Sequence, residues 1–245
     1  MATPESPLFW LLAIFGVILT GISKSGFAGG AGVVAVPLLA LAMPVQQAAA
    51  IMLPLLLVMD VKTLRLYRHT INFKKIRTIS LASLIGIAVA GSAMAMYSST
   101  TLQWILAVFC IVFACWQQLM PLLGKLPGAA LIWGILSGIS STLLHAGGPP
   151  ISIYFLSKGL SKQTWLAQAA MFFALMNFVK IIPYSLNNVW RVEFLLIDLV
   201  LLPIALAGVY LGHKIQAHLS EVTFTLCCRL LLGATGTLLL LKILI

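Results

Sequence analysis

Long apolar runs separated by short polar segments dominate the chain. A helix needs about 20 predominantly apolar residues to cross the hydrocarbon core of a bilayer. Six uninterrupted runs are long enough: 48–66, 78–97, 102–122, 166–186, 192–212 and 222–245. The pattern therefore predicts six membrane-spanning α-helices joined by short loops.

Two further apolar regions, residues 8–43 and 128–157, are interrupted by glycine-rich segments. The first interruption is SKSGFAGGAG (23–32), and the second is SSTLLHAGGPP (140–150). Glycine frees the backbone, and two adjacent prolines withhold amide donors from a continuing helix. Neither region can be one ordinary helix, so we expect each to form a broken or re-entrant helix.

The second half of the chain echoes the first at a constant distance. A shift of 117 positions superposes Asp60 on Asn177 and matches residues in several separate segments. The matches include 21–23 with 138–140, Gly30 with Gly147, Met59 with Met176, Tyr67 with Tyr184 and 88–91 with 205–208. We therefore predict two structural repeats, residues 1–124 and 125–245, each with one broken or re-entrant helix and three transmembrane helices.

Composition strengthens this interpretation. Hydrophobic residues make up 61% of the 245 positions and charged residues 8%, against about 25% charged in an ordinary soluble domain. Mean hydropathy is +1.09, so the apolar surface far exceeds what one globule in water can cover. These values exclude a soluble fold and predict an all-α polytopic membrane protein.

The charged residues suggest an orientation. Net charge is +10, which in a membrane protein reflects the positive-inside rule and contact with anionic lipid rather than nucleic-acid binding. Segment 62–77 holds six Lys and Arg and is the best candidate for a cytoplasmic loop. Inverted repeats with re-entrant helices place ten Lys and Arg inside and two outside, whereas parallel repeats with fully spanning helices place nine inside and three outside. We favour inverted repeats in a multi-pass protein of the bacterial cytoplasmic membrane, and the parallel arrangement stays open.

The two interruptions contain residue types that suit an anion. Unwound backbone at membrane depth must be buried in protein or line a cavity, so twin interruptions predict one central cavity. Glycines there could expose amide donors to a bound oxyanion: Gly26, Gly29, Gly30, Gly32, Gly147 and Gly148. Hydroxyl donors would come from Ser23, Ser25, Ser140, Ser141 and Thr142. The alternative is that these small residues serve close helix packing.

Several ionisable or amide side chains lie inside apolar runs. Lys24 is expected near mid-depth, where a charge is costly, as an anion ligand, a counter-ion of a buried carboxylate, or a side chain that snorkels to an interface. His145 could carry a proton in a coupling cycle, or be a hydrogen-bonded core histidine. The candidates for coupling or gating are Asp60, His145, Gln168, Asn177 and Lys180. Asn177 and Lys180 share a helix face at i,i+3 spacing.

The motifs resemble those of the sulfite exporter TauE/SafE family of membrane permeases. The resemblance rests on GISKSGFAGGAG followed by VVAVPLL, and on the weaker echo GISSTLLHAGGPP in the second half. It implies transport of sulfite, of sulfonates such as sulfoacetate, of thiosulfate or of related small organic anions across the cytoplasmic membrane, coupled to an ion gradient. The second motif departs from a simple glycine run by carrying His145 and two prolines, which puts the substrate in doubt.

We therefore predict a secondary transporter that works by alternating access, and no enzyme. A Ser-His pair in the second interruption lacks an orienting carboxylate nearby, so it is weak evidence for a hydrolase. The expected partners are a small anionic substrate, a coupling proton or cation and the lipid bilayer; no cofactor, metal or nucleic acid is expected, and a homodimer is left open. The alternatives are an anion channel and a non-transporting membrane assembly protein.

Overall fold

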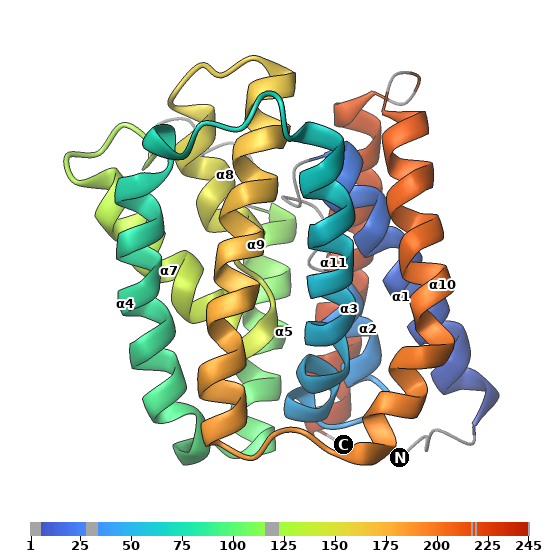
Figure 1. The fold of residues 1–245 in the computed structure, drawn as a ribbon. Helices are drawn as coiled ribbons and strands as arrows, with labels where there is room; N and C mark the ends of the chain where they lie inside the picture. Colours follow the sequence, from blue (N-terminus) through green and yellow to red (C-terminus); the bar gives the residue numbers. More distant parts are fainter. Residues whose placement is uncertain (1–5, 28–33, 116–122, 217, 219, 245) are drawn as a thin grey trace.

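The computed structural model describes residues 6–27, 34–115, 123–216, 218 and 220–244 (Figure 1). Within these ranges every regular element is helical, which confirms the all-α prediction. The helices are α1 (Pro7–Gly26), α2 (Ala35–Ala40), α3 (Val45–Tyr67), α4 (Arg77–Ala93), α5 (Ser99–Cys115), α7 (Ala129–Leu144), α8 (Gly148–Leu156), α9 (Lys162–Leu186), α10 (Val192–Ile215) and α11 (Glu221–Leu244). Two short 3₁₀ helices, η1 (Phe73–Lys75) and η2 (Met94–Met96), complete the set.

The six uninterrupted apolar runs correspond to α3, α4, α5, α9, α10 and α11. Among the described residues, four helical segments are long and apolar enough to cross a membrane: Pro7–Gly26, Arg77–Met96, Lys162–Leu186 and Val192–Ile215. Helices α5 and α7 are apolar but shorter. The helices of the bundle carry many exposed aliphatic side chains, which suit a lipid environment.

The first interruption lies further along the chain than the sequence predicted. Residues 23–26 form the last turn of α1 instead of an unwound segment. The helix ends at Gly26, and Phe27 closes it with a backbone hydrogen bond to the Ser23 carbonyl. The expectation of irregular backbone at 23–26 is therefore wrong, while residues 28–33 lie outside the described part of the chain.

The second interruption is narrower than predicted and spans only residues 145–147, between α7 and α8. His145 ends α7 in the left-handed region, with φ 51° and ψ 28°, a conformation uncommon for residues other than glycine. Pro149 and Pro150 fall in the first turn of α8. Proline is tolerated there because first-turn amides have no partner within the helix.

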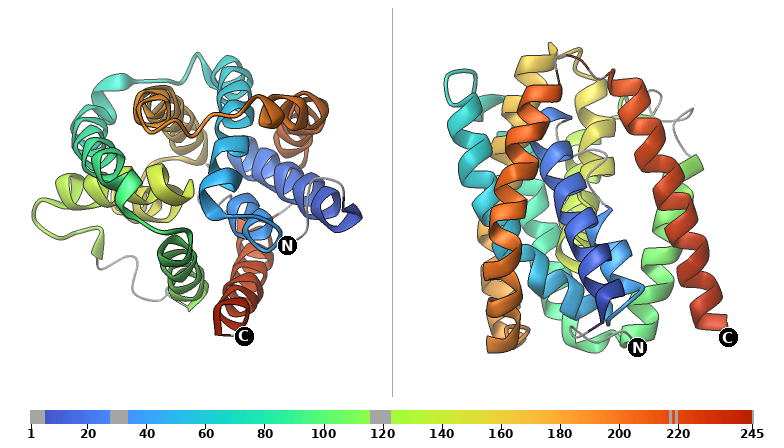
Figure 2. Two further views of the ribbon diagram at one scale, coloured as in Figure 1. Left: turned by 90° about the horizontal axis from the view of Figure 1, so that it is seen from below. Right: turned by 90° about the vertical axis from the view of Figure 1, so that its right-hand side faces the viewer.

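Glycines bring two pairs of helices into close contact. A Cβ at Gly21 on α1 would lie 2.8 Å from the backbone of Gly208 on α10. A Cβ at Gly138 on α7 would collide with the backbone of α4 at Ser83. The view from below in Figure 2 shows α1 beside α10 and α7 beside α4. Small residues thus serve backbone-to-backbone packing in this bundle.

The two broken regions enter from opposite ends of the bundle. In Figure 1, α1 begins and α2 ends at the lower end, whereas α7 begins and α8 ends at the upper end. Helices α3 and α9 pack together and run in opposite directions. The loop between α3 and α4 lies at the upper end, where Gln168 Nε2 of α9 donates to the Thr70 carbonyl at 3.2 Å. The ends of α1 and α7 therefore meet α3 and α9 inside the bundle.

Candidate functional site

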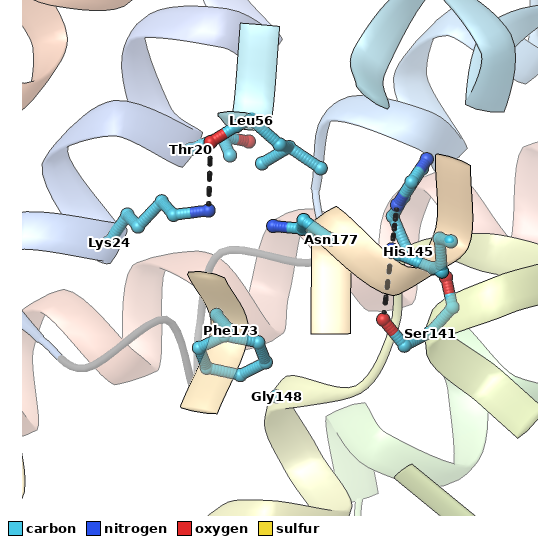
Figure 3. Close-up of a pocket in the computed structure, with 9 residues that line it drawn as sticks. Thr20, Lys24, Leu56, Ser141, His145, Gly148, Phe173 and Asn177 are labelled. Carbon is cyan, nitrogen blue, oxygen red and sulfur yellow. Dashed lines mark hydrogen bonds between the residues drawn. The ribbon is translucent and has the colours of Figure 1, made fainter. Parts of the chain in front are cut away.

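Nine residues line a small cavity inside the helix bundle. They come from α1, α3, the α7–α8 break and α9: Thr20, Lys24, Leu56, Ser141, His145, Gly148, Phe173, Asn177 and Lys180. Figure 3 shows Lys24 on one side, His145 and Ser141 on the other, and Asn177 between them. The cavity volume is about 40 Å³, more than the roughly 10–15 Å³ that one water molecule requires. A small polar guest fits this space without a large rearrangement.

A buried ion pair lies on one side of the cavity. Lys24 Nζ is 2.7 Å from Asp60 Oδ1, and Asn177 Nδ2 donates to Asp60 Oδ2 at 2.7 Å. Lys24 Nζ also donates to the Leu56 carbonyl at 3.3 Å. Lys24 and Asp60 are only 6% and 2% exposed, so each charge depends on the other for stabilisation. Lys24 is thus the counter-ion of a buried carboxylate and does not snorkel to an interface.

Lys180 lies on the opposite side and has different partners. Its Nζ donates to the Ser141 carbonyl at 3.1 Å and to Ser141 Oγ at 3.0 Å. It also lies 2.7 Å from His145 Nδ1. An ammonium group has only donors, so Nδ1 accepts, and the neutral ring carries its proton on Nε2. That Nε2 donates to the Ala49 carbonyl at 2.8 Å.

The helix ends at the cavity explain where the lysines lie. Lys24 belongs to the last turn of α1, and Lys180 donates to a last-turn carbonyl of α7. Carbonyls at helix C-termini lack intrahelical partners and carry partial negative charge, which favours cations. Helix α8 instead presents its N-terminus to the cavity, through Gly148.

Two tyrosines bind the ends of the broken helices in the same way. Tyr184 Oη donates to the Thr142 carbonyl of α7 at 2.8 Å, and Tyr67 Oη donates to the Ser25 carbonyl of α1. Tyr184 Oη also lies 3.3 Å from His145 Nε2. The two tyrosines lie 117 positions apart, which is the repeat distance, but the sequence pattern gave no indication of their role. That shared distance is the signal that could have identified them.

Most of the predicted hydroxyl donors are committed to the backbone. Ser25 Oγ donates toward the carbonyls of Val209 on α10 and Gly21, at 2.7 Å and 3.1 Å. Thr142 Oγ1 donates to the Gly138 carbonyl at 2.8 Å. Ser140 Oγ lies 2.8 Å from the Leu136 carbonyl of α7 and 3.0 Å from the Ala146 carbonyl of the α7–α8 turn. One hydroxyl proton serves one strong hydrogen bond. The expectation that these three hydroxyls face an anion is therefore not met in this structure.

Ser141 and Ser23 differ from the other hydroxyl residues. Ser141 lines the cavity, and its Oγ accepts from Lys180, so its own proton can still donate to a bound group. Ser23 Oγ is buried without a hydrogen-bond partner within the described ranges, but it does not line the cavity.

The predicted glycines divide between packing and the cavity. A Cβ at Gly26 would lie 2.7 Å from the Gly212 carbonyl oxygen of α10, and one at Gly147 would lie 2.9 Å from Ser137 Oγ. Both therefore serve close packing, the alternative considered for them. Gly148 lines the cavity. Three more predicted residues lie outside the described residues: Gly29, Gly30 and Gly32.

Gln168 is not part of the cavity. Besides its bond to Thr70, its Oε1 accepts from the Asn72 amide at 3.4 Å. The side chain therefore holds the loop between α3 and α4 at the upper end of the bundle. Of the residues predicted for coupling or gating, Asp60 contacts two cavity residues, and three others line the cavity: His145, Asn177 and Lys180.

Comparison with known proteins identifies one family. The sequence profile of the family described as sulfite exporter TauE/SafE matches residues 12–239. No curated protein and no solved structure matches the chain.

Proposed function

This chain belongs to the sulfite exporter TauE/SafE family of membrane transporters, and we propose that it moves a small sulfur-containing or organic oxyanion across the bacterial cytoplasmic membrane. Sulfite, sulfoacetate and thiosulfate are the first candidates. The substrate binds in the cavity between Lys24 and Lys180. The buried cationic groups around that space, which outnumber the carboxylates, are the observation that carries the proposal.

Three features favour an oxyanion over a cation at this site. Lys180 Nζ and Asn177 Nδ2 are donor groups at the cavity, and Ser141 Oγ, which accepts from Lys180, can still donate its own proton. The α8 N-terminus adds positive potential at Gly148. In a poorly hydrated interior, these fixed donors act on an anion more strongly than they would in water.

We propose that residues 1–124 and 125–245 are inverted repeats. Support comes from contacts that recur 117 positions apart: Tyr67 with Ser25 and Tyr184 with Thr142. The bonds from Ser25 to Gly21 and from Thr142 to Gly138 recur in the same way. The opposite directions of α3 and α9 fit an inverted relation (Figure 1).

Alternating access would then arise from rocking of one repeat against the other around the cavity. Coupling to a proton would use His145, which joins Lys180 to the Ala49 carbonyl. Asp60 is the candidate for a coupling cation, since it is the carboxylate of the cluster.

Counterflow in proteoliposomes tests the transport mechanism. Vesicles loaded with unlabelled sulfite should accumulate labelled sulfite transiently, because a carrier exchanges substrate across the membrane. Empty vesicles containing the same protein are the control. Uptake without trans-stimulation or saturation would indicate an anion channel, and no uptake of any sulfur oxyanion would favour a non-transporting assembly protein.

A further inference from the structure

More positively than negatively charged side chains surround the cavity. Lys24 and Asp60 form one ion pair. Lys180 has only neutral partners within the described residues, namely Ser141 and His145. Lys24 and Lys180 line the same cavity, and Asp60 contacts Lys24. The empty cavity therefore has a formal excess of one positive charge.

An uncompensated charge in a poorly hydrated interior is costly, whatever its sign. A singly charged anion beside Lys180 makes the formal charge of the whole cluster zero. A doubly charged anion reverses the excess and leaves one negative charge without a partner. Because Lys180 is fully buried, bulk water screens this difference only weakly.

We infer that the cavity selects singly charged oxyanions over doubly charged ones, and that Asp60 sets this preference by neutralising Lys24. The inference rests on the proposed function, because it assigns a charge class to the substrate of the same site. Among the candidate substrates it favours sulfite in its singly protonated form over thiosulfate and sulfoacetate, which carry two charges at neutral pH. It makes Asp60 a specificity-determining residue that never contacts the substrate.

Asp60 has a partner at each of its carboxylate oxygens. Oδ1 forms the ion pair with Lys24, and Oδ2 accepts a hydrogen bond from Asn177, each at 2.7 Å. At the matching position of the second half the chain has the amide of Asn177 instead of a carboxylate. An aspartate there would cancel the remaining charge of Lys180. The pairing of one acid with one amide therefore leaves the cluster with a single positive charge.

Two isosteric substitutions change the net formal charge of the cluster in opposite directions. Asp60→Asn raises the formal excess from one to two positive charges, and Asn177→Asp lowers it to zero. Asp198→Asn is the matched control, because Asp198 on α10 is another buried carboxylate, 8% exposed, that does not line the cavity.

Isothermal titration of the full-length protein in detergent compares methanesulfonate with sulfate, two tetrahedral anions of similar size and different charge. We expect wild-type protein and Asp198→Asn to bind methanesulfonate at least tenfold more tightly than sulfate. Asp60→Asn should reverse the order, and Asn177→Asp should weaken methanesulfonate binding at least tenfold.

Each outcome bears on one claim. Equal or tighter binding of sulfate by the wild-type protein overturns the charge preference, while sulfite counterflow leaves the proposed function standing. Wild-type selectivity in Asp60→Asn overturns the role of Asp60. If that variant does not fold, unchanged methanesulfonate affinity in Asn177→Asp has the same consequence. No binding of either anion, together with no counterflow, contradicts the proposed function itself.

Discussion

Lys24 and Lys180 face one cavity, but the structure stabilises them in different ways. Lys24 has a carboxylate partner 2.7 Å away, whereas Lys180 is held by the neutral groups of Ser141 and His145. Removing one member of a buried ion pair leaves the other charge without compensation. The two lysines should therefore respond differently to substitution.

Lys24→Ala should impair both stability and anion binding. The substitution leaves Asp60 buried with Asn177 as its remaining partner, which costs roughly 3–5 kcal/mol of unfolding free energy. The combined variant Lys24→Ala with Asp60→Asn should regain part of that loss, because it removes the orphaned charge. Thermal unfolding in detergent measures both effects, with exposed Lys62→Ala as the control. An unfolding temperature and anion affinity equal to wild type in Lys24→Ala would remove Lys24 from the site.

His145→Gln should uncouple transport from the pH gradient. Glutamine can still donate to the Ala49 carbonyl and accept from Lys180, but it cannot carry a proton at neutral pH. Sulfite uptake by proteoliposomes, measured with and without an imposed pH gradient, shows the change. His69→Gln, at an exposed histidine, should keep the wild-type response. Gradient dependence that survives in His145→Gln would exclude His145 as the proton carrier.

The sequence identified the ionisable part of the site better than the hydroxyl part. Lys24, Asp60 and Lys180 stand out because a charge inside an apolar run requires a partner or a cavity. The hydroxyl of Ser25 has no such signature. Its acceptor is the Val209 carbonyl, 184 positions away on α10, and no local pattern indicates which helix lies beside it.

At the scale of elements, the two tyrosines connect the broken helices to opposite ends of the bundle. Tyr184 packs with Leu53 and Met94, and Met94 lines a second cavity of about 330 Å³ at the lower end. Tyr67 makes its ring contact with His213 near the upper end. Each tyrosine therefore lies between the central cavity and one face of the protein.

Tyr67→Phe and Tyr184→Phe should open the cavity to opposite sides, because each removes one bond that ties a broken helix in place. Thr20→Cys in a background without the four native cysteines provides a reporter that lines the cavity. We expect faster labelling by a membrane-impermeant maleimide from the upper face in Tyr67→Phe and from the lower face in Tyr184→Phe. Each variant is the control for the other. Identical sidedness in both would contradict a gating role.

Helix positions were more predictable than helix ends. The apolar runs located α3, α4, α9 and α10 because bilayer thickness fixes the length of a spanning helix. The sequence places the end of α1 too early, because a glycine-rich segment that begins at residue 23 predicts unwound backbone. In the structure Gly26 permits contact with α10, and helix packing compensates for its low helix propensity.

At the scale of the whole molecule, basic residues gather at one end. Segment 62–77, with six Lys and Arg, lies at the upper end of Figure 1, and the ends of α2 and α11 lie at the lower end. The positive-inside rule predicts that the upper end is cytoplasmic. Alkaline phosphatase fused after the last residue should therefore be active, whereas a fusion within loop 68–76 should be inactive. The reverse result would invert the orientation.

A bound selenite ion located by anomalous diffraction tests the central claim most directly, because selenium marks the position of a sulfite-like anion without a prior assumption about the site. The account predicts an anomalous peak in the central cavity, within hydrogen-bonding reach of Lys180 Nζ and Ser141 Oγ. A peak elsewhere in the bundle, with this cavity empty under conditions in which selenite stabilises the protein, would contradict it.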